Sequence, residues 1–196
     1  MIKSCVIGLS KIGQIHCNNL KKIKNTSLNF VYDKNLTLRK KTAKRFKCKT
    51  SNSFKEILRN KEIKLFIIAS PTTTHEYYLN KLIQYKKMIY CEKPISLNSL
   101  KLNSLVKKIK TNKIKICIGL NRRFSDTYIK MKKLIKNKKV KIIQIISRSS
   151  NANVQQSVRN GGLFMDKGFH FFDLACWFAN SLPNKIITIA NPLSTK

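Results

Sequence analysis

The residue types best suited to chemistry lie late in the chain, where carboxylates and an imidazole recur at helical spacing. Asp166 and His170 are four residues apart and Asp173 follows three residues later, so a helix would place all three on one side. A carboxylate beside a histidine orients the imidazole and supports its protonated form, which suits a general base that removes a hydroxyl proton near neutral pH. The alternative is that His170 only packs among the aromatic residues of an apolar helix.

A lysine in the middle of the chain is the second candidate. Lys93 stands between Glu92 and Pro94, directly after a short apolar run. A desolvated lysine can hydrogen-bond a substrate oxygen and stabilise developing alkoxide charge. A single lysine carries little information in this lysine-rich chain, so the interpretation depends on the Glu-Lys-Pro triplet and on its place at the end of a strand.

A glycine-bounded turn follows the first apolar run. Gly8 and Gly13 match the first and third glycines of G-x-G-x-x-G, the turn that holds a dinucleotide, while Ser10 stands at the second. Asp33 lies 20 residues beyond Gly13, where a carboxylate accepts both ribose hydroxyls of an adenosine and repels a 2′-phosphate. This favours NAD, although Lys34 keeps NADP possible. The alternatives are a plain strand-to-helix turn and a solvated Asp33.

A polar segment follows the apolar run 65–69 and contains Ser70, Pro71, Thr72 and His75. It delivers hydroxyls and a helix N-terminus to the carboxyl edge of the predicted sheet, where such folds bind ligands. An ordinary position in the first turn of a helix is the alternative for His75.

These residues depend on alternating strands and helices, which predict crossover units and a parallel sheet. We expect strands over residues 2–7, 28–32, 65–69, 88–91 and 114–120. We expect helices over 36–46, 54–58 and 98–109, one beginning at 72–74, and an earlier one whose apolar face comprises Ile12, Ile15, Leu20 and Ile23. Ser53 and Glu56 have the spacing of a capping box at the start of helix 54–58.

The rhythm changes after residue 120. Here we expect a helix over 128–135, a strand over 140–147, a helix over 162–178 and a strand over 186–190. The sequence therefore predicts an α/β protein in which a doubly wound Rossmann domain, residues 1–120, precedes an incomplete α+β second domain with an antiparallel sheet, residues 121–196.

The charge invites a nucleic-acid interpretation, since 41 Lys+Arg against 8 Asp+Glu give a formal net charge of +33. Lysine occurs on almost every predicted polar face and arginine is scarce, so we expect a compositional bias and no specific nucleic-acid partner. No apolar run approaches the ~18 residues that span a bilayer, and we expect a cytoplasmic protein without membrane contact. The six cysteines show no metal-binding spacing and are expected to be reduced, buried thiols.

Together these motifs resemble the Gfo/Idh/MocA family of oxidoreductases. Further motifs that carry the resemblance are Asn121-Arg122-Arg123-Phe124 and the glycine pair Gly161-Gly162 ahead of Asp166. Order and spacing match along nearly the whole chain. Within the family, the Asn-Arg-Arg-Phe run, the segment 147–149 and the glycine pair most resemble the inositol 2-dehydrogenases, which oxidise a ring hydroxyl of a cyclic polyol with NAD.

The resemblance implies a catalytic set of Lys93, Asp166 and His170, with His170 as the general base and a cis Lys93–Pro94 peptide bond. It also implies NAD as cofactor, with NADP possible, a polyol or sugar substrate and a homo-oligomer. The implied cofactor-binding residues are Gly8, Ser10, Lys11, Ile12, Gly13, Asp33, Ser70, Pro71, Thr72, His75, Glu92, Lys93 and Arg122.

Three features depart from the family pattern. Ser10 replaces a glycine, and Phe171 stands where relatives carry an acidic residue. The chain ends at Lys196, before the further strands that in the family supply substrate contacts and a subunit interface. We therefore expect a C-terminally truncated chain in which assembly is doubtful, and a catalytically inactive nucleotide-binding fragment is the alternative function.

Overall fold

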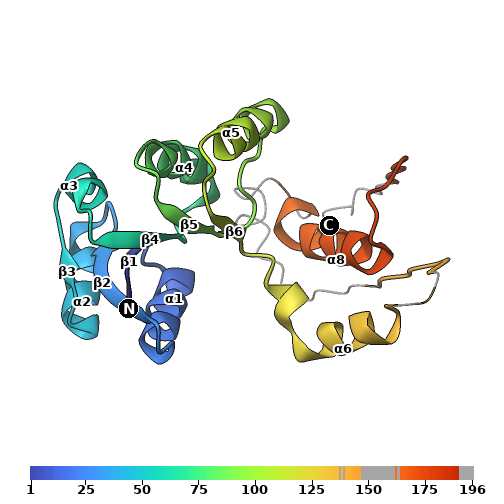
Figure 1. The fold of residues 1–196 in the computed structure, drawn as a ribbon, viewed down its shortest axis with the longest axis horizontal. Coiled ribbons are helices and arrows are strands. Elements are labelled where there is room, and N and C mark those ends of the chain that lie inside the picture. Colours follow the sequence, from blue (N-terminus) through green and yellow to red (C-terminus); the bar gives the residue numbers. More distant parts are fainter. Residues whose placement is uncertain (137, 139, 147–161, 163, 190–196) are drawn as a thin grey trace, which may run out of the picture.

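The first two-thirds of the chain form a six-stranded, all-parallel sheet (Figure 1), seen in a computed structural model that describes residues 1–136, 138, 140–146, 162 and 164–189. The strand order is β3-β2-β1-β4-β5-β6, which reverses direction at β1 and defines a doubly wound fold. The strands are β1 (Ile2–Ile7), β2 (Thr26–Tyr32), β3 (Lys49–Thr50), β4 (Ile63–Ile68), β5 (Met88–Cys91) and β6 (Ile116–Ile118).

Helices connect successive strands and cover both faces of the sheet. They are α1 (Lys11–Lys22), α2 (Leu36–Phe46), α3 (Phe54–Arg59), α4 (His75–Gln84) and α5 (Ser99–Thr111), with a short 3-10 turn, η1 (Thr72–Thr74), before α4. The expected α/β Rossmann architecture is confirmed, and the predicted bounds of α2 and β5 match the observed ones.

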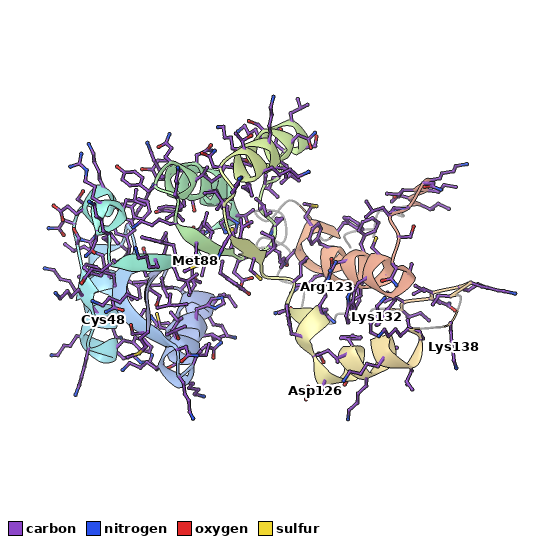
Figure 2. The ribbon with its side chains drawn as sticks, in the orientation of Figure 1. Cys48, Met88, Arg123, Asp126, Lys132 and Lys138 are labelled. Carbon is purple, nitrogen blue, oxygen red and sulfur yellow. The ribbon has the colours of Figure 1, made fainter. Side chains whose placement is uncertain are left out.

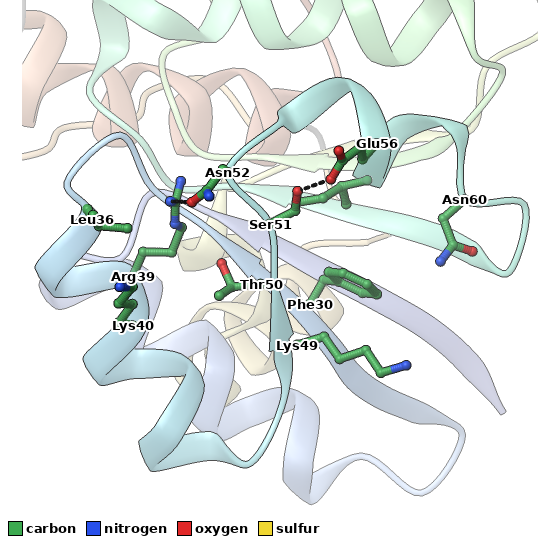
Figure 3. Close-up of a pocket in the computed structure, with 11 residues that line it drawn as sticks. Phe30, Leu36, Arg39, Lys40, Lys49, Thr50, Ser51, Asn52, Glu56 and Asn60 are labelled. Atoms are coloured by element: carbon green, nitrogen blue, oxygen red, sulfur yellow. Dashed lines mark hydrogen bonds between the residues drawn. The ribbon is translucent and has the colours of Figure 1, made fainter.

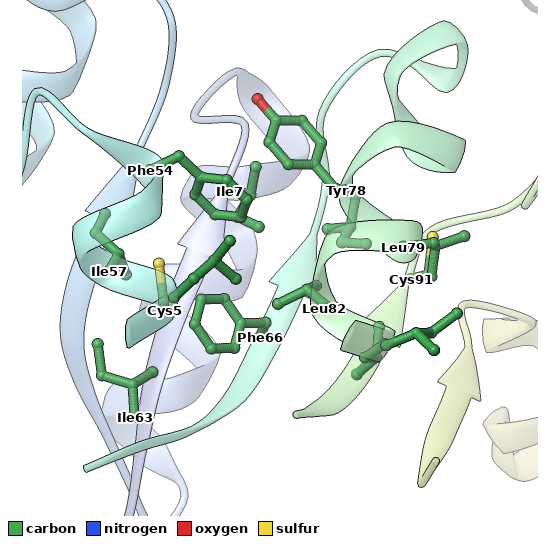
Figure 4. Packing of buried hydrophobic residues seen from close by; sticks show 14 of the residues in the cluster. Cys5, Ile7, Phe54, Ile57, Ile63, Phe66, Tyr78, Leu79, Leu82 and Cys91 are labelled. Carbon is green, nitrogen blue, oxygen red and sulfur yellow. The ribbon is translucent and has the colours of Figure 1, made fainter. Parts of the chain in front are cut away.

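Alternate residues of the central strands point to opposite faces and build two cores. Cys5, Ile7 and Phe66 face α3, α4 and α5 (Figure 4), whereas Val6 and Ile67 face α1 and α2. All five side chains are buried, which is why these strands read as continuous apolar runs in the sequence. This rigid double core fixes the carboxyl ends of the strands, where the candidate residues lie.

The buried face of α1 matches the predicted one at Leu20 and differs from it at the three isoleucines. Gly13, Cys17 and Leu20 are buried, while Ile12 and Ile15 are each 44% exposed and the predicted Ile23 is also exposed. The reason is the close packing of Gly13 on the preceding turn, which rotates the helix so that its glycine, and not the isoleucines, meets the sheet.

The predicted capping box of α3 does not form. Ser53 makes no side-chain cap hydrogen bond; its own backbone N–H donates instead to Ser51 Oγ at 3.0 Å. Glu56 accepts a hydrogen bond from the Ser51 hydroxyl, so the neighbouring serine has taken the partner that a capping box requires. In contrast, the expected helix start at Asn98 is confirmed, because its side chain accepts from Lys101 N at 3.0 Å.

After β6 the described residues are helical or irregular. The elements are η2 (Asn121–Phe124), α6 (Asp126–Leu134), the π-helical turn η3 (Phe164–Gly168) and α8 (Phe169–Ala179). The strands predicted at 140–147 and 186–190 are wrong as far as residues 140–146 and 186–189 are described, since these form no strand. A strand exists only by pairing with a neighbour, and within the described residues these segments have no partner strand; residues 147–149, 161 and 190 lie outside them.

Arg123 of η2 and Lys132 of α6 (Figure 2) both contact α8 and so connect the elements of this part of the chain. Lys132 Nζ donates to the carbonyl oxygens of Trp177 at 2.5 Å and Phe178 at 3.3 Å, at the C-terminal end of α8. A cation there complements the negative end of the helix dipole. The helix predicted over residues 162–178 is observed as two consecutive elements, the π-helical turn η3 and the α-helix α8.

All six cysteines are free thiols, but not all are buried. Cys5, Cys17 and Cys91 are buried, whereas Cys117 is exposed because β6 is an edge strand. Among the described helices none combines the length and the apolar character needed to cross a bilayer.

Candidate functional site

The candidate residues converge because parallel strands end at the same edge of a sheet. Gly8 follows β1, Asp33 follows β2, Ser70 follows β4 and Lys93 follows β5. Thus the polar segments that are up to 85 residues apart in the sequence line one edge, at the point where the strand order reverses.

The turn after β1 requires glycine at both of its ends. Gly8 has a positive φ of 84°, and a Cβ there would lie 2.4 Å from Ser70 Cα. A Cβ on Gly13 would lie 1.9 Å from the Gly8 carbonyl oxygen. At Gly8 the backbone of the turn packs against the backbone that follows β4, and at Gly13 the first turn of α1 packs against the backbone of Gly8.

Asp33 fastens this turn from the side of β2. Its Oδ2 accepts from Leu9 N at 2.8 Å and its Oδ1 accepts from Asn35 N at 2.9 Å. Ser10 is the exposed N-cap of α1 and makes no side-chain cap hydrogen bond, and the first turn of α1 contains no acidic residue. A helix N-terminus with this composition favours an anion such as a pyrophosphate. Lys11 and Ile12 are exposed on the same turn.

The segment after β4 presents backbone and hydroxyls. Ser70 Oγ lies 2.7 Å from Thr74 Oγ1, Pro71 is exposed and Thr72 is half-buried. His75 is only 1% exposed, with Nδ1 2.8 Å from Pro94 O and Nε2 2.9 Å from Ser70 O. The ring therefore joins the end of β4 to the segment after β5, and a contact of His75 with a cofactor stays a prediction.

Lys93 contacts the π-helical turn η3 in the second part of the chain. Its Nζ donates to the Asp166 carbonyl oxygen at 2.5 Å and lies 3.4 Å from Asp166 Oδ1. The two side chains are 16% and 13% exposed, so the pair is largely withdrawn from water. The Lys93–Pro94 peptide bond is cis, as the resemblance implies. The structure thus brings together two residues of the expected catalytic set.

His170 completes that set on the first turn of α8. Burial lowers its pKa from the usual value, and the positive charges of Lys93 and Arg122 lower it further. Its Nδ1 is buried and has no hydrogen-bond partner among the described residues. An imidazole in this state is neutral near pH 7 and able to accept a proton.

Two neighbours of His170 have partners that the sequence did not predict. Asp173 binds Arg123 in a two-pronged ion pair, with Nε to Oδ2 at 2.8 Å and Nη2 to Oδ1 at 2.5 Å. The Arg122 guanidinium lies 4.3 Å from the centre of the Phe171 ring. Phe171, which departs from the family pattern, thereby holds the arginine that was expected near the cofactor.

One contact at this edge is not predicted by the sequence. His16 Nε2 lies 2.8 Å from Glu92 Oε1, joining residues 76 positions apart. The scarcity of acidic residues in the sequence could have pointed to this contact, because each of the few carboxylates in so basic a chain is a candidate for a specific partner. The side chain of Glu92 is turned toward α1, and its expected contact with a cofactor stays a prediction.

A separate cavity of about 610 Å³ lies beside the edge strand β3 (Figure 3). Arg39 lines it and is 5% exposed, with its Nη2 2.6 Å from Asn52 Oδ1. None of the predicted site residues lines this cavity, so it belongs to a different surface. Within the described part of the chain, no group of three or more His, Cys, Asp or Glu side chains is placed to hold a metal ion.

A doubly wound sheet with this turn, carboxylate and strand edge defines a Rossmann-type nucleotide-binding protein. Residues 2–120 match the family model GFO_IDH_MocA, described as an oxidoreductase family with an NAD-binding Rossmann fold. The chain belongs to this family.

Curated relatives and solved structures agree with that assignment. Myo-inositol 2-dehydrogenase of Thermotoga maritima is 31% identical over 175 residues, which cover 87% of this chain and 52% of that protein. Inositol 2-dehydrogenase of Rhizobium meliloti is 27% identical over 195 residues, or 97% of this chain and 59% of that one. A crystal structure from Sinorhizobium meliloti, provisionally assigned as a myo-inositol dehydrogenase, superposes with a TM-score of 0.87 at 27% identity, covering 93% and 56% of the two chains. The chain thus spans about half the length of the curated relatives that it matches.

Proposed function

We propose that this chain carries the cofactor-binding and catalytic residues of an NAD-dependent oxidoreductase that acts on a ring hydroxyl of a cyclic polyol or sugar. The observation that supports it most is the junction of Lys93 with Asp166, four residues before His170, at the same sheet edge as the glycine turn. Relatives named inositol 2-dehydrogenase support the substrate class.

The residues at the first turn fit a dinucleotide. Gly8 and Gly13 keep the backbone close-packed, and the N-terminus of α1 with Lys11 supplies positive charge for the pyrophosphate. Asp33 has lone pairs left for a ribose, and its negative charge disfavours the 2′-phosphate of NADP. We therefore propose NAD as the preferred cofactor, with Ser10, Ile12, Ser70, Pro71 and Thr72 along its path.

The chemistry assigned to the chain's own residues is proton removal and charge stabilisation. Lys93 hydrogen-bonds the reacting oxygen, and Asp166 holds the lysine in place. His170, kept neutral by burial and by nearby positive charge, accepts the hydroxyl proton. The nicotinamide, when bound, supplies the hydride acceptor. Arg122 is positioned by Phe171 and borders the site.

The alternative function is a nucleotide-binding fragment without catalysis. It is favoured by the described part of residues 121–196, which contains helices but no sheet to complete a substrate pocket.

The test follows NADH formation by the purified chain across a panel of cyclic polyols and aldoses. Lys93→Ala and His170→Ala are expected to abolish turnover while leaving NAD binding intact, whereas Lys107→Ala, an exposed lysine on α5, is expected to have no effect. Full turnover by either site variant would refute the assigned roles. A chain that binds NAD and turns over no member of the panel would favour the alternative.

A further inference from the structure

His16, Tyr90 and Glu92, the residue before Lys93 in the sequence, form a partly buried polar cluster outside the set of residues assigned to the reaction. His16 projects from α1 to the end of β5, where its Nε2–H donates to Glu92 Oε1 at 2.8 Å. The two side chains are 16% and 20% exposed, so this contact is mostly shielded from water. Ion pairs and hydrogen bonds in such surroundings are stronger than those at the surface.

The Glu92 carboxylate is enclosed on its other sides as well. The Tyr90 hydroxyl donates a hydrogen bond to it, and burial followed by the Glu92 charge raises the pKa of that tyrosine. A Cβ on Gly119, the residue after β6, would lie 2.7 Å from Glu92 Oε2, so the carboxylate lies directly against this glycine and occupies the space that a side chain would take. His16 and Tyr90 also touch through their rings, with centroids 5.0 Å apart. The position of this carboxylate is therefore set by three elements.

This fixed negative charge acts on His170. The groups that influence His170 are Lys93 and Arg122, which lower its pKa, and Glu92 and Asp173, which raise it. Asp173 is already engaged by Arg123, whose positive charge offsets its own. Asp166 lies against Lys93 itself, and Glu92 is the remaining carboxylate that raises the pKa of His170.

We propose that His16 is a positioning residue: its imidazole holds the Glu92 carboxylate at the sheet edge, where that charge offsets Lys93 and Arg122 at His170. The assignment of His170 as the base rests on the proposed function, but the contact and its electrostatic effect do not require catalysis. Without this hydrogen bond the carboxylate loses its partner on α1 and turns toward the space that His16 leaves, so that less negative charge offsets the two cations at His170.

The experiment is an NMR titration of the histidine rings in the whole chain. The chain has three histidines, so the ring signals of His16, His75 and His170 are assigned by single substitution. Glu92→Gln and His16→Ala are each expected to lower the pKa of His170 by about half a pH unit or more. His16→Gln retains a donor for the carboxylate and is expected to leave the His170 pKa near the wild-type value.

Two matched controls separate this effect from general changes. Glu62→Gln removes an exposed carboxylate elsewhere, and Asn18→Ala alters an exposed residue on α1; neither is expected to move His170. The His75 signal reports that each variant is folded.

An unchanged His170 pKa in His16→Ala overturns the proposal. An upward shift in both His16 variants also overturns it, because His16 would then act by its own charge and not by holding Glu92. Failure of the proposed function is distinct, since it leaves these titrations as expected and removes only NADH formation.

Discussion

Replacing Gly13 by alanine tests whether the turn after β1 is packed as tightly as the structure indicates. The added Cβ would lie 1.9 Å from Gly8 O and 2.9 Å from Gly8 C, whereas real Cβ contacts stay above 3.0 Å. Both contacts are with backbone, so no side-chain rotation relieves them. The turn and α1 must therefore separate by about 1 Å, which is typical of overpacked sites that lose about 1–3 kcal/mol.

The assay combines thermal unfolding with an NAD titration. For a chain of this length the loss corresponds to a fall in Tm of about 2–12 °C. Because the proposed function has this backbone hold the pyrophosphate, we also expect the Kd for NAD to rise at least about tenfold, or ~1.4 kcal/mol. Ile15→Ala, an exposed position on the same helix, is the control and is expected to change stability by no more than about 0.5 kcal/mol. Gly13→Ala with wild-type Tm and Kd would refute the packing argument.

Three further predictions follow from individual contacts. The lowered pKa of His170 means that the unfolded chain binds more protons than the folded one between about pH 6.5 and the folded pKa. The stability contribution of His170 is therefore fully present above about pH 6.5 and is lost as the pH falls through the folded pKa; urea unfolding at several pH values, with and without His170→Gln, measures it. Asp173→Ala breaks the ion pair with Arg123 and is expected to cost about 1–2 kcal/mol by urea unfolding, and an unchanged midpoint would contradict the pairing. Iodoacetamide is expected to label exposed Cys117 at least about tenfold faster than buried Cys5, whose pKa burial raises; equal rates by mass spectrometry would contradict the burial of Cys5.

The sequence predicts the sheet edge well because the relevant signals are local. Gly8, Gly13 and Asp33 stand at fixed distances from strand ends, and apolar runs mark buried strands whatever lies on the surface. The order of the strands then brings Lys93 to the same edge without further information.

Contacts between distant segments are what the sequence does not predict. The pairing of His16 with Glu92 spans 76 residues and depends on how α1 is rotated, which Gly13 decides and the spacing of isoleucines does not. Likewise, the β-branched apolar residues over 140–146 favour a strand, but pairing needs a neighbour that no local pattern supplies.

The central claim is most directly tested by calorimetric titration of the purified chain with NAD and with NADP. We predict saturable binding of NAD, weaker binding of NADP, and a reversal of this preference in Asp33→Ser, because the carboxylate repels the 2′-phosphate. Thermal stabilisation should follow RT ln(1 + [L]/Kd). A folded chain that binds neither dinucleotide would contradict the account.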